Sequence, residues 1–264
     1  MMPRNPRHVL ITGSTSGIGE AAALAFARGG DTVYVNGRNA ERTAKAAQRI
    51  RNAAGESAGE IVAVAADIAT AEGAEEIFTA IGELDVLVNN AGIYTESPPF
   101  EISDEEWRRH FEVNVLSGIR LTRHYAPRMA ERGWGRVIFI SSECGVTTPP
   151  EMIHYGMTKS ALLAVSRGFA IGVAGTGVTV NCVLPGPTRT PGAEEFVAKM
   201  YGDIPFEEAE RRYFAEVRPA SLIQRFSLPS EVANLIHYVA SAGASATTGA
   251  ALRVDGGVIA TIIP

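Results

Sequence analysis

The stretch that decides the fold of this chain is HVLITGSTSGIG, from His8 to Gly19. A short apolar run leads directly into a glycine-rich turn, and an alanine-rich helical segment follows. In this context Gly13 permits a tight turn, Gly17 lets the backbone approach a pyrophosphate, and Gly19 lets the helix pack closely on the sheet. The amides at the helix N-terminus would face such an anion. The stretch therefore predicts a dinucleotide-binding unit, although three glycines at a helix start can also be a structural turn alone.

The same alternation of strand and helix continues along the chain. Short β-branched runs predict strands at residues 8–11, 32–35, 61–65, 84–88, 137–140, 178–183 and 251–254. Stretches with helical apolar spacing lie between them, at residues 18–28, 40–53, 71–81, 105–132, 155–173 and 230–240. This order is typical of parallel strands joined by helices. We predict an α/β fold: a Rossmann-type, doubly wound parallel β-sheet of about seven strands with helices on both faces.

We expect a single domain, residues 1–264, because a chain of this length forms an ordinary doubly wound unit and no linker-like stretch divides it. Residues 187–228 break the alternation of strands and helices. Prolines there separate short amphipathic pieces at 194–201 and 206–214. Long excursions of this kind in a compact domain are usually functional. We predict that this segment is a mobile lid over a substrate site.

Composition and charge exclude several classes of function. The net charge is −5 and no dense basic cluster is present, which argues against a nucleic-acid partner or a membrane-surface helix. The two cysteines, Cys144 and Cys182, have neither disulfide-framework nor zinc-site spacing, so we expect no metal. We see no signal peptide and no membrane span. These features predict a cytoplasmic protein that acts on a small molecule.

Four polar residues form a candidate catalytic set. Tyr155 and Lys159 are four residues apart, which places them on one face of a helix. A phenol is a poor acid or base at neutral pH, and a neighbouring ammonium would favour its ionised form. Ser142 follows a predicted strand, whose carboxyl end faces the ligand crevice in this fold. Asn114 lies inside a predicted helix, where asparagine is unfavourable, and a locally distorted helix with a bound water is one reason for its presence.

With these motifs in order, the sequence resembles the short-chain dehydrogenase/reductase family in its single-domain form, including its 3-oxoacyl-[acyl-carrier-protein] reductase-like members. The resemblance covers nearly the whole chain. It rests on the glycine-rich turn, Asp67, the run NNAG at 89–92, Asn114, Ser142, Tyr155 with Lys159, and Pro185 with Gly186. It implies hydride transfer between a nicotinamide and a carbonyl or alcohol substrate.

The resemblance also implies a role for each matching residue. Tyr155 would be the general acid in reduction and the general base in oxidation, and Ser142 would position the substrate oxygen. Lys159 would bind the nicotinamide ribose, and Asn114 would hold a water that relays protons. The cofactor-binding residues implied are Gly13, Ser14, Thr15, Ser16, Gly17, Ile18, Gly19, Arg38, Asp67, Ile68, Asn90, Ala91, Gly92, Tyr155, Lys159, Pro185, Gly186, Thr188 and Thr190.

Two residues depart from the family pattern. Glu143 follows the catalytic serine, where small or apolar residues are common, and Thr188 stands where an aliphatic residue is frequent. Both departures bear on the substrate and not on the class of reaction.

The end of the second strand predicts which dinucleotide is preferred. An acidic side chain there binds the ribose hydroxyls and repels a 2′-phosphate, whereas an arginine pairs with that phosphate. In this chain Gly37 stands where NAD enzymes of the family usually have aspartate, and Arg38 follows. Ser14 and Thr15 could add hydroxyl contacts. We expect NADP(H) to be preferred over NAD(H); the alternative role for Arg38 is to stack on the adenine.

Substrate and assembly have several interpretations. Alcohols, ketones and 3-oxoacyl thioesters are all candidate substrates. A nicotinamide-binding sensor without turnover, or an epimerase or dehydratase on the same scaffold, is the alternative function, and the complete catalytic set argues against the sensor. The helical stretches 105–132 and 155–173 are apolar around much of their circumference. Together with the family resemblance, this suggests a homotetramer.

Other reactive side chains are interpreted as structural. His110 and His154 have no nucleophile to serve, and Cys144 has no basic neighbour in the sequence that would lower its pKa. The arginines between 211 and 218 lie among glutamates. We predict a solvated helix face there, rather than a site for an acidic carrier protein.

Overall fold

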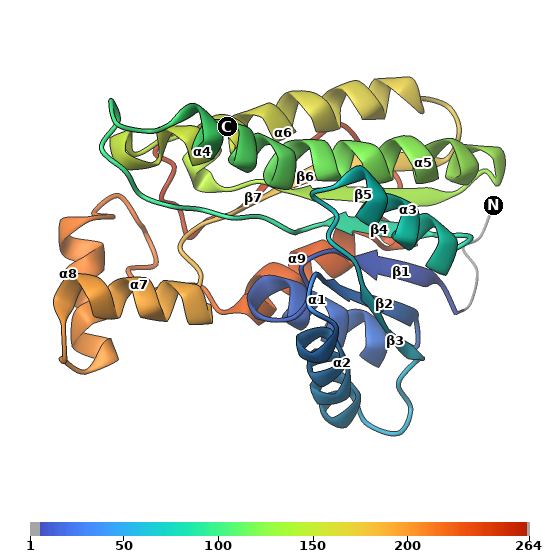
Figure 1. Ribbon diagram of the computed structural model, residues 1–264, viewed down its shortest axis with the longest axis horizontal. Coiled ribbons are helices and arrows are strands. Elements are labelled where there is room, and N and C mark those ends of the chain that lie inside the picture. Colours follow the sequence, from blue (N-terminus) through green and yellow to red (C-terminus); the bar gives the residue numbers. More distant parts are fainter. Residues whose placement is uncertain (1–5, 263–264) are drawn as a thin grey trace.

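The computed structural model describes residues 6–262, which form one parallel sheet of seven strands (Figure 1). The strands are β1 (His8–Ile11), β2 (Thr32–Gly37), β3 (Ile61–Ala65), β4 (Val86–Asn89), β5 (Gly135–Ile140), β6 (Val178–Pro185) and β7 (Ala251–Val254). Their order across the sheet is β3-β2-β1-β4-β5-β6-β7. The chain thus builds outward from β1 to β3 and then, on the other side, from β4 to β7. This confirms the doubly wound α/β fold.

Helices cover both faces of the sheet. One face carries α1 (Gly17–Arg28), α2 (Ala40–Ala54) and α9 (Pro229–Val239), and the other carries α3 (Ala71–Ala80), α5 (Ser117–Glu131) and α6 (Ile153–Gly172). Each layer has its own apolar core between helices and sheet. None of the described helices is long and apolar enough to cross a membrane.

The central strands β1 and β4 each contain a run of three apolar residues because both of their faces are buried. In β1, Val9 and Ile11 pack under α1 and α2, whereas Leu10 packs under the opposite helices. β4 repeats the arrangement with Leu87 on the Leu10 side. Side chains of a strand alternate between faces, so a strand with a helix layer on each side needs an unbroken apolar run.

The expected single helix over 105–132 is three segments. α4 (Asp104–Phe111) is followed by a π-helical turn (Glu112–Leu116), and only then does α5 begin. Asn114 lies in the π-helical turn, where the backbone widens by one residue per hydrogen bond. The local distortion that the sequence predicted at Asn114 is therefore present, but it divides the helix.

Most predicted elements end within two residues of their observed ends. β2 runs on through Asn36 and Gly37, because the Asn36 side-chain amide donates to Val64 O at 3.1 Å and to Ala66 O at 3.2 Å. These bonds hold the end of β2 against the chain leaving β3. The carboxyl end of the strand is thereby fixed where a ligand would approach.

The segment between β6 and α9 forms a separate small layer. Its helices are α7 (Pro191–Tyr201) and α8 (Phe206–Glu216), which stand to one side of the main body (Figure 1). Val197, Phe214 and Phe226 form part of an apolar cluster within this layer. The layer is therefore stabilised largely by its own contacts.

Thr12 joins the ends of β1 and β4, where the chain directions diverge. Its hydroxyl accepts hydrogen bonds from the backbone N–H groups of Asn90 and Ala91, both at 3.0 Å, and the residue is 1% exposed. An unpaired buried amide costs about 1–3 kcal/mol. The hydroxyl therefore holds both turns in register.

We expect Thr12→Val to lower the free energy of unfolding by about 1–3 kcal/mol, because the Ala91 amide loses its acceptor while the side-chain volume is kept; the Asn90 amide retains Val88 O at 3.0 Å. Thr12→Ser keeps the hydroxyl and loses one methyl group, which costs about 0.8 kcal/mol. Urea unfolding of the three proteins checks this. Equal losses for valine and serine would contradict the role given to the hydroxyl.

Candidate active site

A pocket of about 410 Å³ opens at the carboxyl ends of the central strands. The residues predicted for the site that line it are Ser16, Gly17, Ile18, Gly19, Asn90, Gly92, Ser142, Tyr155, Lys159, Pro185, Gly186, Thr188 and Thr190. Gly13, Ser14, Thr15, Arg38, Asp67, Ile68, Ala91 and Asn114 lie outside this lining. The fold thus brings most of the predicted residues, from five separate parts of the sequence, to one cavity.

The glycine-rich turn has the shape that a pyrophosphate needs. Gly13 and Gly17 both have positive φ, +62° and +59°. A Cβ at Gly13 would lie 2.8 Å from Ala91 Cα, so the turn after β1 touches the turn after β4. Ser16 precedes α1 and gives no side-chain cap to its first amides. These amides face the pocket without a capping partner, which fits an anionic group at this helix end.

Asn90 fixes this turn from the β4 side. Its side-chain amide donates to Thr12 O at 2.9 Å and to Gly13 O at 3.2 Å. A Cβ at Gly19 would lie 2.6 Å from the same Asn90 nitrogen. Asn90 therefore supports the turn, and the absence of a side chain at Gly19 lets it do so.

The expected hydroxyl contact from Ser14 to a 2′-phosphate is not supported. Ser14 is fully buried, and its Oγ donates to Ile11 O at 2.7 Å and accepts from Asn36 N at 3.0 Å. The hydroxyl is thus already used to join β1 to β2. Ile68 is also buried, at 5% exposure, so only its backbone can face a ligand.

Two arginines follow β2 at the surface. Arg38 is exposed, and no hydrogen bond or ion pair joins it to another described residue. Arg42, in the first turn of α2, places Nη2 3.5 Å from Ser16 Oγ on the glycine-rich turn. The sequence reasoning missed Arg42, although its position four residues after Arg38 was a signal. Asp67 is exposed after β3, where its Oδ1 accepts from Ala69 N at 3.1 Å.

The phenol, ammonium and hydroxyl of the catalytic set meet in the pocket. Tyr155 and Lys159 lie near the start of α6, and Ser142 lies just after β5. Lys159 Nζ is 5.4 Å from the centre of the Tyr155 ring and donates to Ile140 O at 2.9 Å. The Tyr94 ring packs edge-on to the Tyr155 ring at 6.1 Å. The set is therefore held between a strand end, a helix and the loop after β4.

Burial is the largest influence on the pKa values of Tyr155 and Lys159. It raises the pKa of Tyr155 well above its usual value, Cys144 and Glu143 raise it further, and the hydrogen bond with Ser142 lowers it. Burial also lowers the pKa of Lys159 to about 8. The expected depression of the tyrosine pKa is thus absent in the protein alone, because lost hydration outweighs the ammonium. The phenol therefore keeps its proton in the protein alone, and the phenolate that forms when it gives that proton up needs stabilisation from a neighbouring positive charge.

Asn114 joins the loop after β4 to α6. Its Oδ1 accepts from Ile93 N at 2.8 Å, and its Nδ2 donates to Ile93 O at 2.9 Å and to Thr158 Oγ1 at 3.0 Å. A Cβ at Gly92 would lie 3.4 Å from both Asn114 Oδ1 and Lys159 Nζ. The asparagine, the glycine and the lysine thus border one small space.

Glu143 turns out to be part of the site. Ser142 Oγ donates to Glu143 Oε2 at 2.6 Å, and Cys144 N donates to Ser142 Oγ at 3.2 Å. Arg218 Nε lies 3.7 Å from Glu143 Oε1, and both side chains are largely buried. For Arg218, the predicted solvated helix face is therefore wrong: this residue follows the end of α8 and points back into the pocket.

The segment after β6 closes the pocket on its other side. Thr188 Oγ1 donates to Gly186 O at 2.9 Å and lies 3.0 Å from Ser227 Oγ, so its hydroxyl is already satisfied. Thr190 accepts from Ala193 N at 3.2 Å and caps α7. Thr190 Cγ2 would be 3.0 Å from a Cβ at Gly17, which places the start of α7 against the glycine-rich turn.

Two further carboxylates that sequence reasoning missed line the pocket. Glu96 lies on the loop after β4, and Glu151 lies in the short helical turn before α6. Ser97 N donates to Glu151 O at 3.0 Å, which joins the two loops. Neither residue belongs to a local motif, because only the fold brings these loops together.

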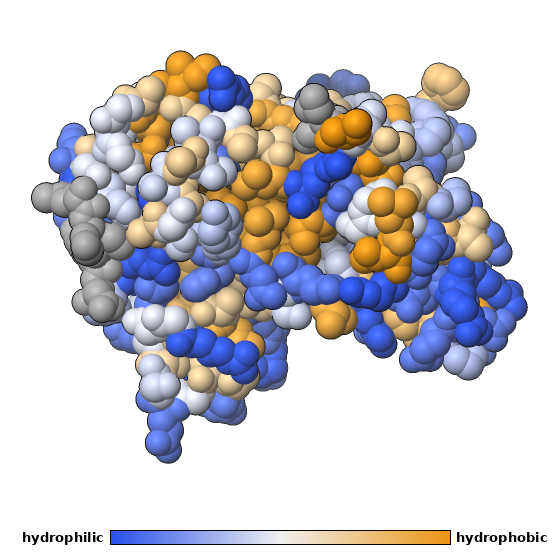
Figure 2. All heavy atoms as spheres, turned by 180° about the vertical axis from the view of Figure 1, so that it is seen from behind, coloured by the Kyte–Doolittle hydropathy of each residue, from blue (hydrophilic) through white to orange (hydrophobic). Residues whose placement is uncertain are grey.

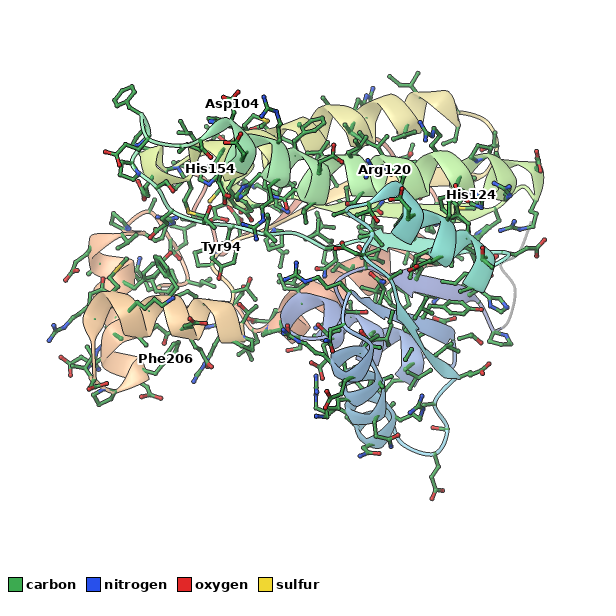
Figure 3. All side chains as sticks on the ribbon, in the orientation of Figure 1. Tyr94, Asp104, Arg120, His124, His154 and Phe206 are labelled. Carbon is green, nitrogen blue, oxygen red and sulfur yellow. The ribbon has the colours of Figure 1, made fainter. Side chains whose placement is uncertain are left out.

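The histidines set aside above form a buried cluster behind the catalytic helix. The His110 and His154 rings are 4.3 Å apart, and Thr95 Oγ1 lies 2.8 Å from His154 Nε2 and donates to Glu106 Oε1 at 3.0 Å. The ligand-type atoms of Glu106, His110 and His154 lie within 4.8 Å of one another. These contacts of the Thr95 hydroxyl with His154 and Glu106 anchor the loop that carries Tyr94. The Tyr94 side chain points toward α7 (Figure 3).

Comparison with known proteins adds to this geometry. Residues 7–200 match the family model described as short chain dehydrogenase. The chain is 44% identical over 255 residues to an uncharacterized oxidoreductase of Bacillus subtilis, covering 96% of each chain. It is 32% identical over 250 residues to a 3-oxoacyl-[acyl-carrier-protein] reductase of Aquifex aeolicus, covering 94% of this chain and 96% of that protein. L-sorbose reductase of Gluconobacter frateurii, solved with NADPH and L-sorbose, superimposes with a TM-score of 0.90 at 32% identity over 99% of both chains.

Neither cysteine should react in the folded protein. Burial raises the pKa of Cys182 to about 12, and burial together with the Glu143 carboxylate raises that of Cys144 to about 12. At pH 8 only roughly one thiol in 10⁴ would be ionised, and the thiolate is the reactive form. We expect iodoacetamide to label neither residue at pH 8 until the protein is unfolded in urea, as measured by mass spectrometry. Rapid labelling of native Cys144 would contradict this.

Proposed function

The chain belongs to the short-chain dehydrogenase family, and on this basis we propose that it is an NADP(H)-dependent oxidoreductase that interconverts a carbonyl compound and an alcohol. The observation that carries the proposal is the meeting of Ser142, Tyr155 and Lys159 in one pocket with the uncapped start of α1. A bound nicotinamide would supply the hydride in reduction and accept it in oxidation.

The residues of this chain would handle the proton and the substrate oxygen. Tyr155 donates its proton to the carbonyl oxygen in reduction, and burial keeps that proton in place beforehand. Ser142 Oγ donates to Glu143 in the protein alone, and its hydroxyl would turn to donate to the same carbonyl oxygen when substrate binds. Lys159, with a pKa of about 8, is largely charged at neutral pH and stabilises the phenolate left after proton transfer. Asn114, bonded one turn from the tyrosine, would hold a water through which the proton is replaced.

A preference for NADP(H) is supported at the end of β2. Gly37 offers no carboxylate to repel a 2′-phosphate, and the exposed guanidinium of Arg38 has no partner among the described residues. Arg42 is a second cation near the glycine-rich turn. L-sorbose reductase, the structural relative named above, was solved with NADPH. In this fold a change of only a few residues near the adenosine ribose is enough to alter which cofactor is preferred.

The alternative functions have weaker support. A sensor without turnover has no need for a buried tyrosine beside a lysine and a serine. An epimerase or dehydratase would use the same tyrosine, but the named relatives of known reaction are reductases. The substrate class suggested by those names is wide, from a 3-oxoacyl thioester to a sugar ketone.

We further propose that residues 187–228 act as a lid and that substrate choice depends on them. Helices α7 and α8 form their own apolar cluster, and this segment supplies Arg218 and Phe196 to the pocket wall. A layer with its own core can move as a unit over the cavity. A cytoplasmic location is also proposed, since both thiols are free and buried, as is usual in a reducing compartment.

A homotetramer is proposed from the outer surface of α6. Ala164, Gly168 and Ile171 are exposed there, and Ile171 is 64% exposed. Small residues allow two helices to approach closely. Figure 2 shows apolar side chains gathered in the middle and upper parts of the face opposite to Figure 1. Leu162, which lies in the apolar stretch 155–173 that suggested this interface, is 2% exposed and belongs to the core instead.

We expect Tyr155→Phe to lower kcat by about 10² to 10⁴-fold, because the phenyl ring has no proton to donate. NADPH affinity should change little, since the ring and its contact with Tyr94 remain. Stopped-flow absorbance at 340 nm and fluorescence titration of NADPH measure the two quantities. Nearly full turnover in the phenylalanine variant would refute the role given to Tyr155.

We expect NADPH to be preferred over NADH by at least about tenfold in kcat/KM, equivalent to about 1.4 kcal/mol. Arg38→Leu combined with Arg42→Leu should remove that preference by raising KM for NADPH alone. Gly37→Asp is unsuited as a test, because a Cβ there would lie 2.5 Å from Thr15 Cγ2. Equal use of both cofactors by the unmodified protein would defeat the argument.

A further inference from the structure

The wall of the pocket beyond Ser142 is unusually polar for a substrate site. Five charged residues line the pocket among the described residues: Glu96, Glu143, Glu151, Lys159 and Arg218. Lys159 belongs to the catalytic set, so three carboxylates face the single guanidinium of Arg218. We propose that Glu143 and Arg218 form a hydroxyl-binding subsite, which selects carbonyl substrates with a hydroxyl on the carbon next to the carbonyl. This rests on the proposed reductase function.

The spacing of the two side chains is suited to a hydroxyl group. Arg218 Nε and Glu143 Oε1 are 3.7 Å apart, beyond a good direct hydrogen bond. Glu143 Oε2 is used by Ser142, and Arg218 Nη1 is used by Val217 O at 3.1 Å. The two facing atoms therefore each lack a close partner in this direction. A hydroxyl between them would accept from Nε–H and donate to Oε1, which neither a methyl nor an ammonium group can do.

The position of the pair fixes where that hydroxyl lies on the substrate. Ser142 Oγ, which orients the reacting oxygen in the proposed mechanism, is itself bonded to Glu143 at 2.6 Å. The other oxygen of the same carboxylate, Oε1, is therefore separated from the reacting oxygen by the Ser142 hydroxyl and by the width of the carboxylate. Substituents on the carbon next to the carbonyl reach that distance, whereas more distant ones extend past the pair.

The surrounding charges disfavour an anionic substituent. Glu96 and Glu151 stand at the same side of the pocket, and burial and Glu151 raise the pKa of Glu96 while Arg218 lowers it. A carboxylate or phosphate on the substrate would meet three carboxylates and only one guanidinium, itself already facing Glu143. Tyr94, Phe196 and Phe226 also line the pocket, and these aromatic side chains suit an aliphatic remainder of the substrate.

The test compares ketones of matched size with the holoenzyme and NADPH. 1-Hydroxy-2-hexanone should exceed 2-heptanone in kcat/KM by at least about tenfold, since a site built to bond a hydroxyl leaves polar groups unpaired with the analogue that lacks it. 2-Oxohexanoate and 1-amino-2-hexanone should both fall below the hydroxyketone by a similar factor. A keto acid or an aminoketone that matched or exceeded the hydroxyketone would overturn the proposal.

Substitutions of Arg218 and Glu143 test whether these two side chains cause the preference for the hydroxyketone. Arg218→Met and Glu143→Gln should each reduce the ratio of hydroxyketone to heptanone at least about fivefold, whatever happens to the rate on heptanone itself. Arg211→Met removes the same charge from the exposed side of α8, away from the pocket, and should leave the ratio unchanged. A preference that survives in both pocket variants would show that the hydroxyl is bound elsewhere.

Binding separates this proposal from the function on which it rests. Calorimetry with NADP⁺-loaded protein should show tighter binding of hexane-1,2-diol than of 2-heptanol, and Arg218→Met should abolish the difference. If no ketone is reduced but this difference is found, the proposed reductase function fails and the subsite stands. If ketones are reduced but the hydroxyl gives no advantage in rate or binding, only the subsite is refuted.

Discussion

The contact between the turns after β1 and β4 sets the position of the other groups in the pocket. Between β1 and β4 the order of the strands reverses, so that the connection after β1 leads to one side of the sheet and the connection after β4 leads to the other. A crevice forms where these two connections separate. The turns meet so closely that Gly13 has no room for a side chain beside Ala91. Thr12 and Asn90 then satisfy the backbone groups exposed by this close approach. The start of α1 is thereby fixed at the floor of the pocket.

The catalytic helix is positioned by polar contacts rather than by apolar packing alone. Asn114 pairs with both backbone groups of Ile93 and with Thr158, one turn from Tyr155. The π-helical turn contributes to this geometry. Its backbone hydrogen bonds span one more residue than those of an α-helix, and this changes the direction in which the Asn114 side chain leaves the helix. On the other side of α6, His154 bonds to Thr95 in the loop that carries Tyr94. The loop after β4 and the helix are thus joined at two points around the tyrosine.

Burial has opposite consequences for the acid and the base of this pocket. It holds the tyrosine proton in place and at the same time weakens the lysine's hold on its own proton. Glu143 adds a carboxylate to an already desolvated site, which would be costly without a partner. Arg218, which follows the end of α8, faces it at 3.7 Å. The charge balance next to Ser142 therefore depends on the position of the segment that carries Arg218.

The sequence by itself determined the parts of the molecule that depend on local order along the chain. Strand and helix periodicity, the glycine spacing after β1 and the Tyr155–Lys159 pair on one helix face are all short-range patterns, so the sheet, the tight turn before α1 and the meeting of Tyr155 with Lys159 in one pocket could be predicted. The distortion at Asn114 was also visible, because asparagine is unfavourable inside a helix. Its extent was not, since the π-helical turn depends on Ile93 and Thr158.

Only the tertiary structure decided which side chains face the substrate and which are used internally. From the sequence, Ser14 was expected to contact a phosphate. In the structure its hydroxyl bonds to Ile11 O in β1 and to Asn36 N in β2. Arg218 reads as a surface charge, but it lies 3.7 Å from Glu143, which is 75 positions earlier in the chain. Partners this far apart are brought together by the fold and leave no periodic or local signal. The family and the fold were therefore legible in sequence motifs, whereas the lining of the pocket depends on long-range contacts between loops.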